Sequence, residues 1–230
     1  MSQFLQSYVI PVCLYEEQSG AVFIREFLGT AFFVNSRGLF LTAAHVLKNA
    51  LLRSTTTGWK IGLCQNGEEG LSPNSVMCPI REYEFAEKPY DIAIGISTMP
   101  SETLLTLTQL EVSAWQDVAT LGYPSSIAGG DVERFDIGLR CLKGYVQRVV
   151  QPGEIKVAFH PISFELSFPV SSGLSGSPLF VHRTPKDILV GVCVGSIRFP
   201  DRPSVVIDHL GGDVTLNKRV SAARRSRAVV

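Results

Sequence analysis

Charged side chains are scarce in this 230-residue chain: they make up 18% of it, while 45% of the residues are hydrophobic. Average proteins carry about 25% charged residues. Long apolar runs are also missing. The longest nearly uncharged apolar run, Ile188–Ile197, has ten residues, against the ~20 that a membrane-spanning helix needs. With 20 glycines and 13 prolines, the composition favours a compact protein of short buried strands and tight turns, without a membrane span.

Cysteine is sparse as well. The five cysteines are odd in number and contain no C-x-x-C pair, which argues against a disulfide framework and against a zinc site. The first seven residues lack the basic and apolar regions of a secretory signal. We therefore expect a cytoplasmic protein with reduced cysteines, no metal and no other cofactor.

Segments rich in β-branched and aromatic residues recur along the chain between turn residues, and this pattern predicts strands. Asn35–Gly38 is predicted to turn a hairpin, because Gly38 can take a positive φ. A helix of two or three turns is predicted from Ala43 to Leu52. Pro100–Leu110 has no clear strand pattern and is interpreted as the connection between two sets of about six strands. The expected domains are residues 1–110, residues 111–212 and a basic tail, residues 213–230.

Three short segments carry side chains that can act together in acyl transfer. Thr42-Ala43-Ala44-His45 ends in a histidine, Asp91 precedes an alternating strand, and Gly173-Leu174-Ser175-Gly176 holds a serine between glycines. A serine hydroxyl is a poor nucleophile near neutral pH, so it needs an imidazole to take its proton and a carboxylate to orient that imidazole. The sequence offers Ser175 as nucleophile, His45 as base and Asp91 as orienting acid.

In this order the segments resemble those of the trypsin-like, chymotrypsin-fold serine proteases, especially the compact bacterial and intracellular members. Gly29-Thr30-Ala31 and Leu121-Gly122-Tyr123-Pro124 add to the resemblance, which covers roughly residues 8–210. It implies an all-β fold of two six-stranded antiparallel β-barrels, with the active site in the cleft between them. It also implies that the backbone N–H groups of Gly173 and Ser175 form an oxyanion hole.

The resemblance places the pocket for the residue on the acyl side of the cut bond between Pro169–Ser172 and Gly191–Ser196. Neither segment contains a charged residue, and burying an unpaired charge costs on the order of several kcal/mol. We therefore expect cleavage after small or medium apolar residues. Cys193 stands where glutamyl-specific relatives carry a histidine, and His160 would overturn the prediction if it reached the pocket. Three residues are expected to offer a strand edge to the substrate: Val194, Gly195 and Ser196.

The C-terminal tail has its own electrostatic character, because five basic residues follow the last acidic residue, Asp213. Such a tail could attract the phosphates of nucleic acid or of an acidic membrane. Leu216, Val220 and Ala223 recur at helical spacing, which favours instead a short C-terminal helix docked on the second barrel.

The expected function is that of a serine endopeptidase acting on peptide or protein substrates, open to regulation by a partner protein. Two alternatives stay open. One is a peptide-binding or scaffold module that has the protease fold but little turnover, and the other is an acyl hydrolase of the esterase type.

Overall fold

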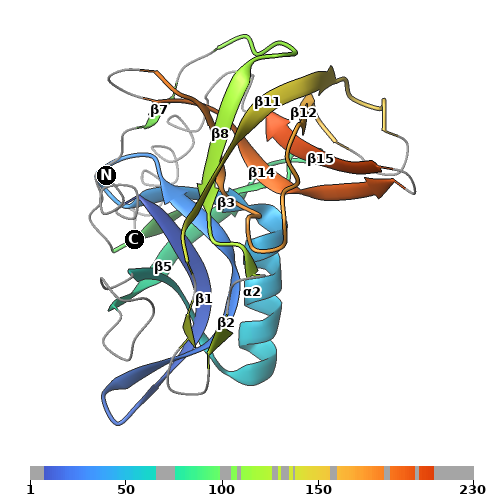
Figure 1. The fold of residues 1–230 in the computed structure, drawn as a ribbon. Coiled ribbons are helices and arrows are strands. Elements are labelled where there is room, and N and C mark those ends of the chain that lie inside the picture. Colours follow the sequence, from blue (N-terminus) through green and yellow to red (C-terminus); the bar gives the residue numbers. More distant parts are fainter. Residues whose placement is uncertain are drawn as a thin grey trace, which may run out of the picture.

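The computed structural model describes residues 8–65, 76–98, 105–107, 110–125, 129–130, 135–136, 138–155, 160–183, 187–199 and 202–209. Over these residues the protein is mostly β-structure with a single α-helix. Figure 1 shows the strands in two groups, with the first strands of the chain (blue to green) beside the helix and most of the later strands (yellow-green to red) forming the second group.

The first six strands form a closed barrel in the order β1-β2-β3-β6-β5-β4, and every neighbouring pair is antiparallel. Fully buried aromatic rings, among them Phe32, Phe33 and Phe40, fill its interior. Gly38 takes a φ of 80° in the turn between β2 and β3, which confirms the predicted hairpin. The six strands are β1 (Val9–Gln18), β2 (Ala21–Phe33), β3 (Leu39–Ala43), β4 (Lys60–Gln65), β5 (Val76–Phe85) and β6 (Ile92–Ser97).

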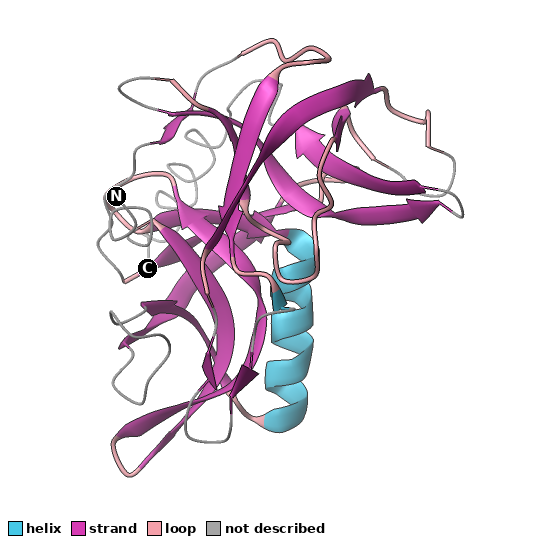
Figure 2. Cartoon of the chain, in the orientation of Figure 1, coloured by secondary structure: helices cyan, strands magenta, loops and turns pink. Residues whose placement is uncertain are grey.

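Helix α2 (Ala44–Thr57) follows β3 directly and lies along the outside of the first barrel (Figure 2). Ala44, Val46, Leu47 and Ala50 form its buried face. The helix extends beyond the predicted end at Leu52. The three threonines of its last turn each donate a hydroxyl hydrogen bond to the carbonyl four residues earlier, so their hydroxyls find partners within the helix. It ends at Gly58, whose φ of 77° allows the left-handed cap.

The second group is a sheet in the order β13-β8-β11-β12-β15-β14-β7. Because β13 also pairs with β14, six of these strands close into a ring of antiparallel pairs. The predicted mostly-β fold with two six-stranded units is therefore confirmed. The strands are β7 (Leu105–Leu107), β8 (Asp117–Gly122), β11 (Arg140–Val150), β12 (Ser163–Leu166), β13 (Pro178–Val181), β14 (Asp187–Phe199) and β15 (Arg202–His209).

Two small elements differ from the expected pair of barrels. Strand β7 lies inside the segment interpreted as a connection, and it adds to β14 as a parallel neighbour. Three residues are too few to show an alternating pattern, so the sequence could not reveal it. Strands β9 (Gly129–Gly130) and β10 (Phe135–Asp136) form a separate two-stranded sheet. The predicted C-terminal helix and the basic tail lie outside the described residues.

The two units share a hydrophobic core. Leu121, Phe180 and Val192 of the second sheet belong to the same buried cluster as the aromatic rings of the first barrel. Tyr123, which follows β8, is 1% exposed and donates its hydroxyl to the carbonyl of Val9, 3.0 Å away in β1. The contact between the units is therefore a packed interior, which fixes how residues from the two units lie relative to one another.

Candidate active site

His45 and Asp91 lie in contact at one end of the first barrel. His45 is the second residue of α2, and Asp91 immediately precedes β6, the strand that pairs with β3. The Asp91 carboxylate accepts two hydrogen bonds from His45, one from the ring Nδ1 (2.5 Å) and one from the backbone N–H (2.9 Å). The carbonyl of Asp91 accepts a third bond, from the N–H of Ala44 (2.9 Å).

This contact decides the protonation of the neutral imidazole. A carboxylate only accepts hydrogen bonds, so Nδ1 of His45 carries the proton and Nε2 is left as an acceptor. In the described part of the chain, Nε2 makes no hydrogen bond, and the His45 side chain is 47% exposed. A ring held in this way can take a proton from a group that approaches Nε2.

Ser175 lies on the serine loop, which we define as Ser171–Ser177. Gly173 and Gly176 have φ values of 90° and 89°, in the left-handed region that favours glycine. A Cβ atom at Gly173 would overlap the carbonyl oxygen of Tyr123, and one at Gly176 would overlap the carbonyl oxygen of Thr30. Both glycines are therefore required by conformation and by space, and Ser175 between them is half-buried.

The serine loop is bound to the first barrel beside His45. The N–H of Thr30 donates to the carbonyl of Ser175 (2.8 Å). A Cβ atom at Gly29 would lie 2.9 Å from that carbonyl oxygen and 2.8 Å from Cγ2 of Val46, the residue after His45. The structure thus brings the Ser175 segment against the start of α2. Among the residues described, no hydrogen bond joins the Ser175 hydroxyl to His45.

The backbone N–H groups of the serine loop fall into two sets. Those of Leu174, Gly176 and Ser177 donate to carbonyls of Ser171, Cys193 and Leu174, at 3.1, 2.6 and 3.0 Å. Those of Ser171, Ser172, Gly173 and Ser175 donate to no carbonyl within the described ranges. Both N–H groups predicted to form an oxyanion hole, those of Gly173 and Ser175, are therefore among the four that the loop leaves available.

The predicted strand edge lies where the pairing of β14 is interrupted. Pairing of β14 with β13 extends to Val192, and the register with β15 skips from Cys193 to Ser196. Val194 and Gly195 are half-buried in this gap, and Gly195 has a φ of 142°. Ser196 pairs through its backbone with Val205. Val194 and Gly195 therefore have no strand partner in these ladders.

Cys193 does not carry out the role of the histidine in glutamyl-specific relatives. Its side chain is fully buried in the core of the second sheet, with Sγ 3.4 Å from the hydroxyl of Thr120. Burial raises the pKa of the Cys193 thiol to about 12, so it stays protonated at neutral pH. Val170 and Leu174 belong to the same buried cluster, which keeps this side of the predicted pocket apolar.

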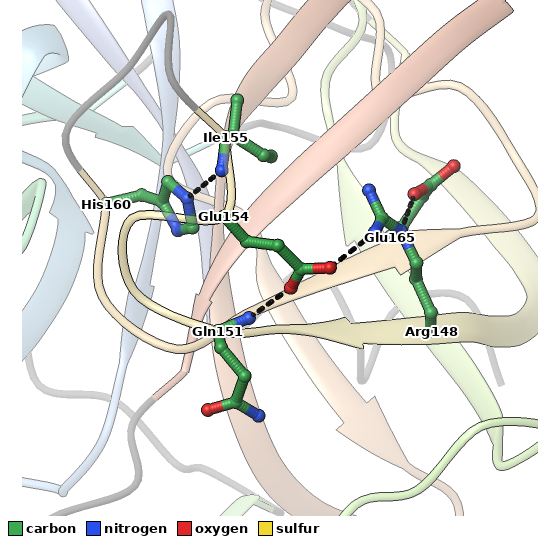
Figure 3. Close-up of polar contacts among 6 residues, drawn as sticks. All are labelled: Arg148, Gln151, Glu154, Ile155, His160 and Glu165. Carbon is green, nitrogen blue, oxygen red and sulfur yellow. Dashed lines mark hydrogen bonds and ion pairs between the residues drawn. The ribbon is translucent and has the colours of Figure 1, made fainter.

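His160 is held by its own loop, as Figure 3 shows. Its Nδ1 donates to the carbonyl of Pro161 (2.7 Å), and its Nε2 accepts from the N–H of Ile155 (3.3 Å). The ring is 4% exposed and has both nitrogens engaged, which is the environment of a structural histidine. In the same view, Glu154 bridges Arg148 (2.8 Å) and the N–H of Gln151 (2.7 Å).

Two residues that contact the serine loop carry no sequence signal of that role. Thr30 donates its hydroxyl to the carbonyl of Gly173 (2.9 Å), and Ser125 donates both its N–H (2.8 Å) and its hydroxyl (3.0 Å) to the carbonyl of Ser172. A threonine in a strand is typical of β-structure, and a serine after proline is typical of a turn. Only the three-dimensional contacts reveal them.

Within the described ranges, no group of three or more His, Cys, Asp or Glu side chains is placed to hold a metal ion. The described helix is too short and too polar to cross a membrane.

Comparison with known proteins decides the family. Residues 29–192, more than two thirds of the chain, match the family model for the trypsin-like peptidase domain. The chain belongs to this family. No curated protein matches the trypsin-like chain. Among solved structures it is similar to Rv3671c from M. tuberculosis H37Rv, solved as a serine-to-alanine mutant in an inactive form, with a TM-score of 0.57 and 16% identity over 96% of this chain and 89% of that one. This likeness shows a shared fold.

Proposed function

We propose that this trypsin-like protein is a serine endopeptidase that uses Ser175, His45 and Asp91. The observation that carries the proposal is the bond between the Asp91 carboxylate and Nδ1 of His45, with the serine loop packed beside it. That bond orients the imidazole and leaves Nε2 as the acceptor, which is the arrangement a serine nucleophile requires.

In the proposed reaction, Nε2 of His45 takes the proton of the Ser175 hydroxyl while Oγ bonds to the substrate carbonyl carbon. The carbonyl oxygen becomes negatively charged and lies near the N–H groups of Gly173 and Ser175, each worth about 3 to 4 kcal/mol as a preorganised donor. The carbon–nitrogen bond then breaks, and His45 gives its proton to the leaving amine. Water, activated by the same imidazole, hydrolyses the acyl-enzyme.

We further propose that substrate binds as an added strand along Val194, Gly195 and Ser196. The first two of these residues have no partner in the ladders that β14 forms with β13 and β15. We propose that the adjoining pocket lies between Pro169–Ser172 and Gly191–Ser196. Val170 and Cys193 are buried and uncharged there, which favours small or medium apolar side chains. A cytoplasmic location and the three expected domains, 1–110, 111–212 and 213–230, belong to the same hypothesis.

One observation favours a second candidate, a peptide-binding module with little turnover. No hydrogen bond links the Ser175 hydroxyl to His45 in the described structure, so a protein with this fold could bind an extended peptide without cutting it. The two candidates make opposite predictions for covalent chemistry at Ser175.

A fluorophosphonate probe separates them. The purified protein is incubated with the probe, and the modified residue is located by peptide mass spectrometry, with Ser175→Ala as the matched control. Modification at Ser175 in the wild type, absent in the control, supports the endopeptidase. An unlabelled wild type that still binds peptides would favour the binding module.

A further inference from the structure

The peptide bond between Ser172 and Gly173 is held in one orientation from outside the serine loop. Its carbonyl oxygen accepts two hydrogen bonds from Ser125, one from the N–H (2.8 Å) and one from the hydroxyl (3.0 Å). In a planar trans peptide the C=O and the N–H point in opposite directions. The N–H of Gly173 is therefore directed away from Ser125, and it makes no bond to any carbonyl of the described chain.

The next peptide bond is fixed by a buried residue of the first barrel. Thr30 is fully buried, and its hydroxyl donates to the carbonyl of Gly173 (2.9 Å) while it accepts the N–H of Tyr123 (3.1 Å). The bond from Tyr123 orients the hydroxyl so that its proton points at Gly173. The backbone N–H of Thr30 also holds the carbonyl of Ser175 (2.8 Å).

The hydrogen bonds from Ser125 and Thr30 fix the peptide groups on either side of Gly173, a residue whose own backbone is unusually free to rotate. Gly173 has a φ of 90° and no side chain to restrict its neighbouring peptide planes. If the Ser172–Gly173 peptide turned over, its carbonyl rather than its N–H would face the site, and both bonds from Ser125 would be lost. The anchors on either side of Gly173 therefore select one of the orientations that glycine allows.

We propose that Ser125 and Thr30 are positioning residues that keep the Gly173 N–H aimed at the substrate oxygen. This inference rests on the proposed function, because it assigns the orientation of a donor in that reaction. Ser125 acts on the peptide before Gly173, and Thr30 acts on the peptide after it. In the described part of the chain, neither hydroxyl makes a hydrogen bond to the side chain of Ser175 or His45.

The test compares Ser125→Ala and Thr30→Val with Thr30→Ser, which keeps the hydroxyl. Ser54→Ala is the matched control, because its hydroxyl also donates to a backbone carbonyl, that of Trp59 (2.6 Å), outside the site. Losing one hydrogen bond costs less than leaving a buried polar group unpaired. We expect kcat to fall about three- to tenfold for Ser125→Ala and at least about tenfold for Thr30→Val.

The kinetic measurements must distinguish a misdirected Gly173 N–H from a general loss of structure. A misdirected N–H weakens only the charged transition state, so KM should change less than about twofold while the affinity for a peptide boronate falls in step with kcat/KM. Thr30→Ser should recover most of the rate lost in Thr30→Val. If Thr30→Val fails to fold, the half-buried Ser125 decides the question alone.

The possible outcomes distinguish a failure of the positioning role from a failure of the proposed function. Equal kcat in Ser125→Ala and Ser54→Ala, with a wild type that reacts at Ser175, would overturn the inference and leave the endopeptidase standing. A rise in KM at unchanged kcat would also overturn it. A wild type with neither turnover nor probe labelling would overturn the proposed function itself, and the positioning role with it.

Discussion

The side chain of Ser177, in the serine loop, fills the space that a side chain at Gly122 of β8 would need. Enlarging Gly122 and shortening Ser177, singly and together, therefore tests how tightly the loop packs on the second sheet. A methyl group at Gly122 would overlap the Ser177 hydroxyl and would lie 2.8 Å from Cδ2 of Leu174. Ser177 is fully buried, and in the part of the chain that the structure describes its hydroxyl has no hydrogen-bond partner. The space admits a side chain at one of the two positions.

The expected magnitudes follow from this contact. Gly122→Ala should lower the free energy of unfolding by about 1–3 kcal/mol, the usual cost of overpacking a core. Ser177→Gly removes an unpaired buried hydroxyl, a gain of about 1–3 kcal/mol, offset by roughly 0.5–1 kcal/mol for the added glycine. In the double variant the new methyl group fills the vacated space, so most of the loss caused by Gly122→Ala should disappear.

Urea unfolding followed by circular dichroism measures these changes, provided that the four proteins share one m value. The coupling free energy between the two substitutions should be about 1–3 kcal/mol. Gly122→Ala combined with Ser113→Gly, at an exposed position, is the matched control and should be additive. Additivity of Gly122→Ala and Ser177→Gly to within about 0.5 kcal/mol would refute the shared space.

Two further predictions concern the site and its surroundings. Ser175→Ala and His45→Ala should each abolish peptide hydrolysis without changing the melting temperature appreciably, because both side chains are partly exposed; retained hydrolysis in Ser175→Ala would contradict its role as nucleophile. Iodoacetamide at neutral pH should modify Cys141 first, since it alone of the five cysteines is exposed and since burial raises the pKa of Cys193 to about 12; mass mapping that finds Cys193 modified first in folded protein would contradict this.

The sequence predicted those features that depend on local chemistry. Gly38 marked the hairpin, and the segment after His45 had the composition of a helix. The roles of His45, Asp91 and Ser175 came from short motifs in a familiar order, and the structure brings His45 and Asp91 together. Their catalytic roles stay predictions.

Features that depend on tertiary contacts could not be predicted. Strand β7 exists because Leu105–Leu107 finds a parallel partner far along the chain in β14, where Leu105 lies beside Asp187 and Leu107 beside Leu189. Val192 and Cys193 are adjacent in β14, yet both are fully buried, in two different core clusters. A strand that lies between two cores is apolar on both faces, so its sequence does not alternate between polar and apolar residues. The orientation of the Cys193 side chain therefore could not be predicted from the sequence.

Asp91 completes the first turn of helix α2 as well as orienting the imidazole, because its carboxylate and carbonyl accept the N–H groups of His45 and Ala44. Ala43 at the N-cap supplies no side-chain bond of its own. A helix N-cap is worth about 0.5–2 kcal/mol. Losing this carboxylate would therefore lower the stability of the fold even in a related protein that no longer cleaves peptides. Descendants of this chain that abandoned catalysis for binding would therefore be expected to change Ser175 freely while keeping Asp91, and the acid alone would be a poor marker of which copies remain enzymes.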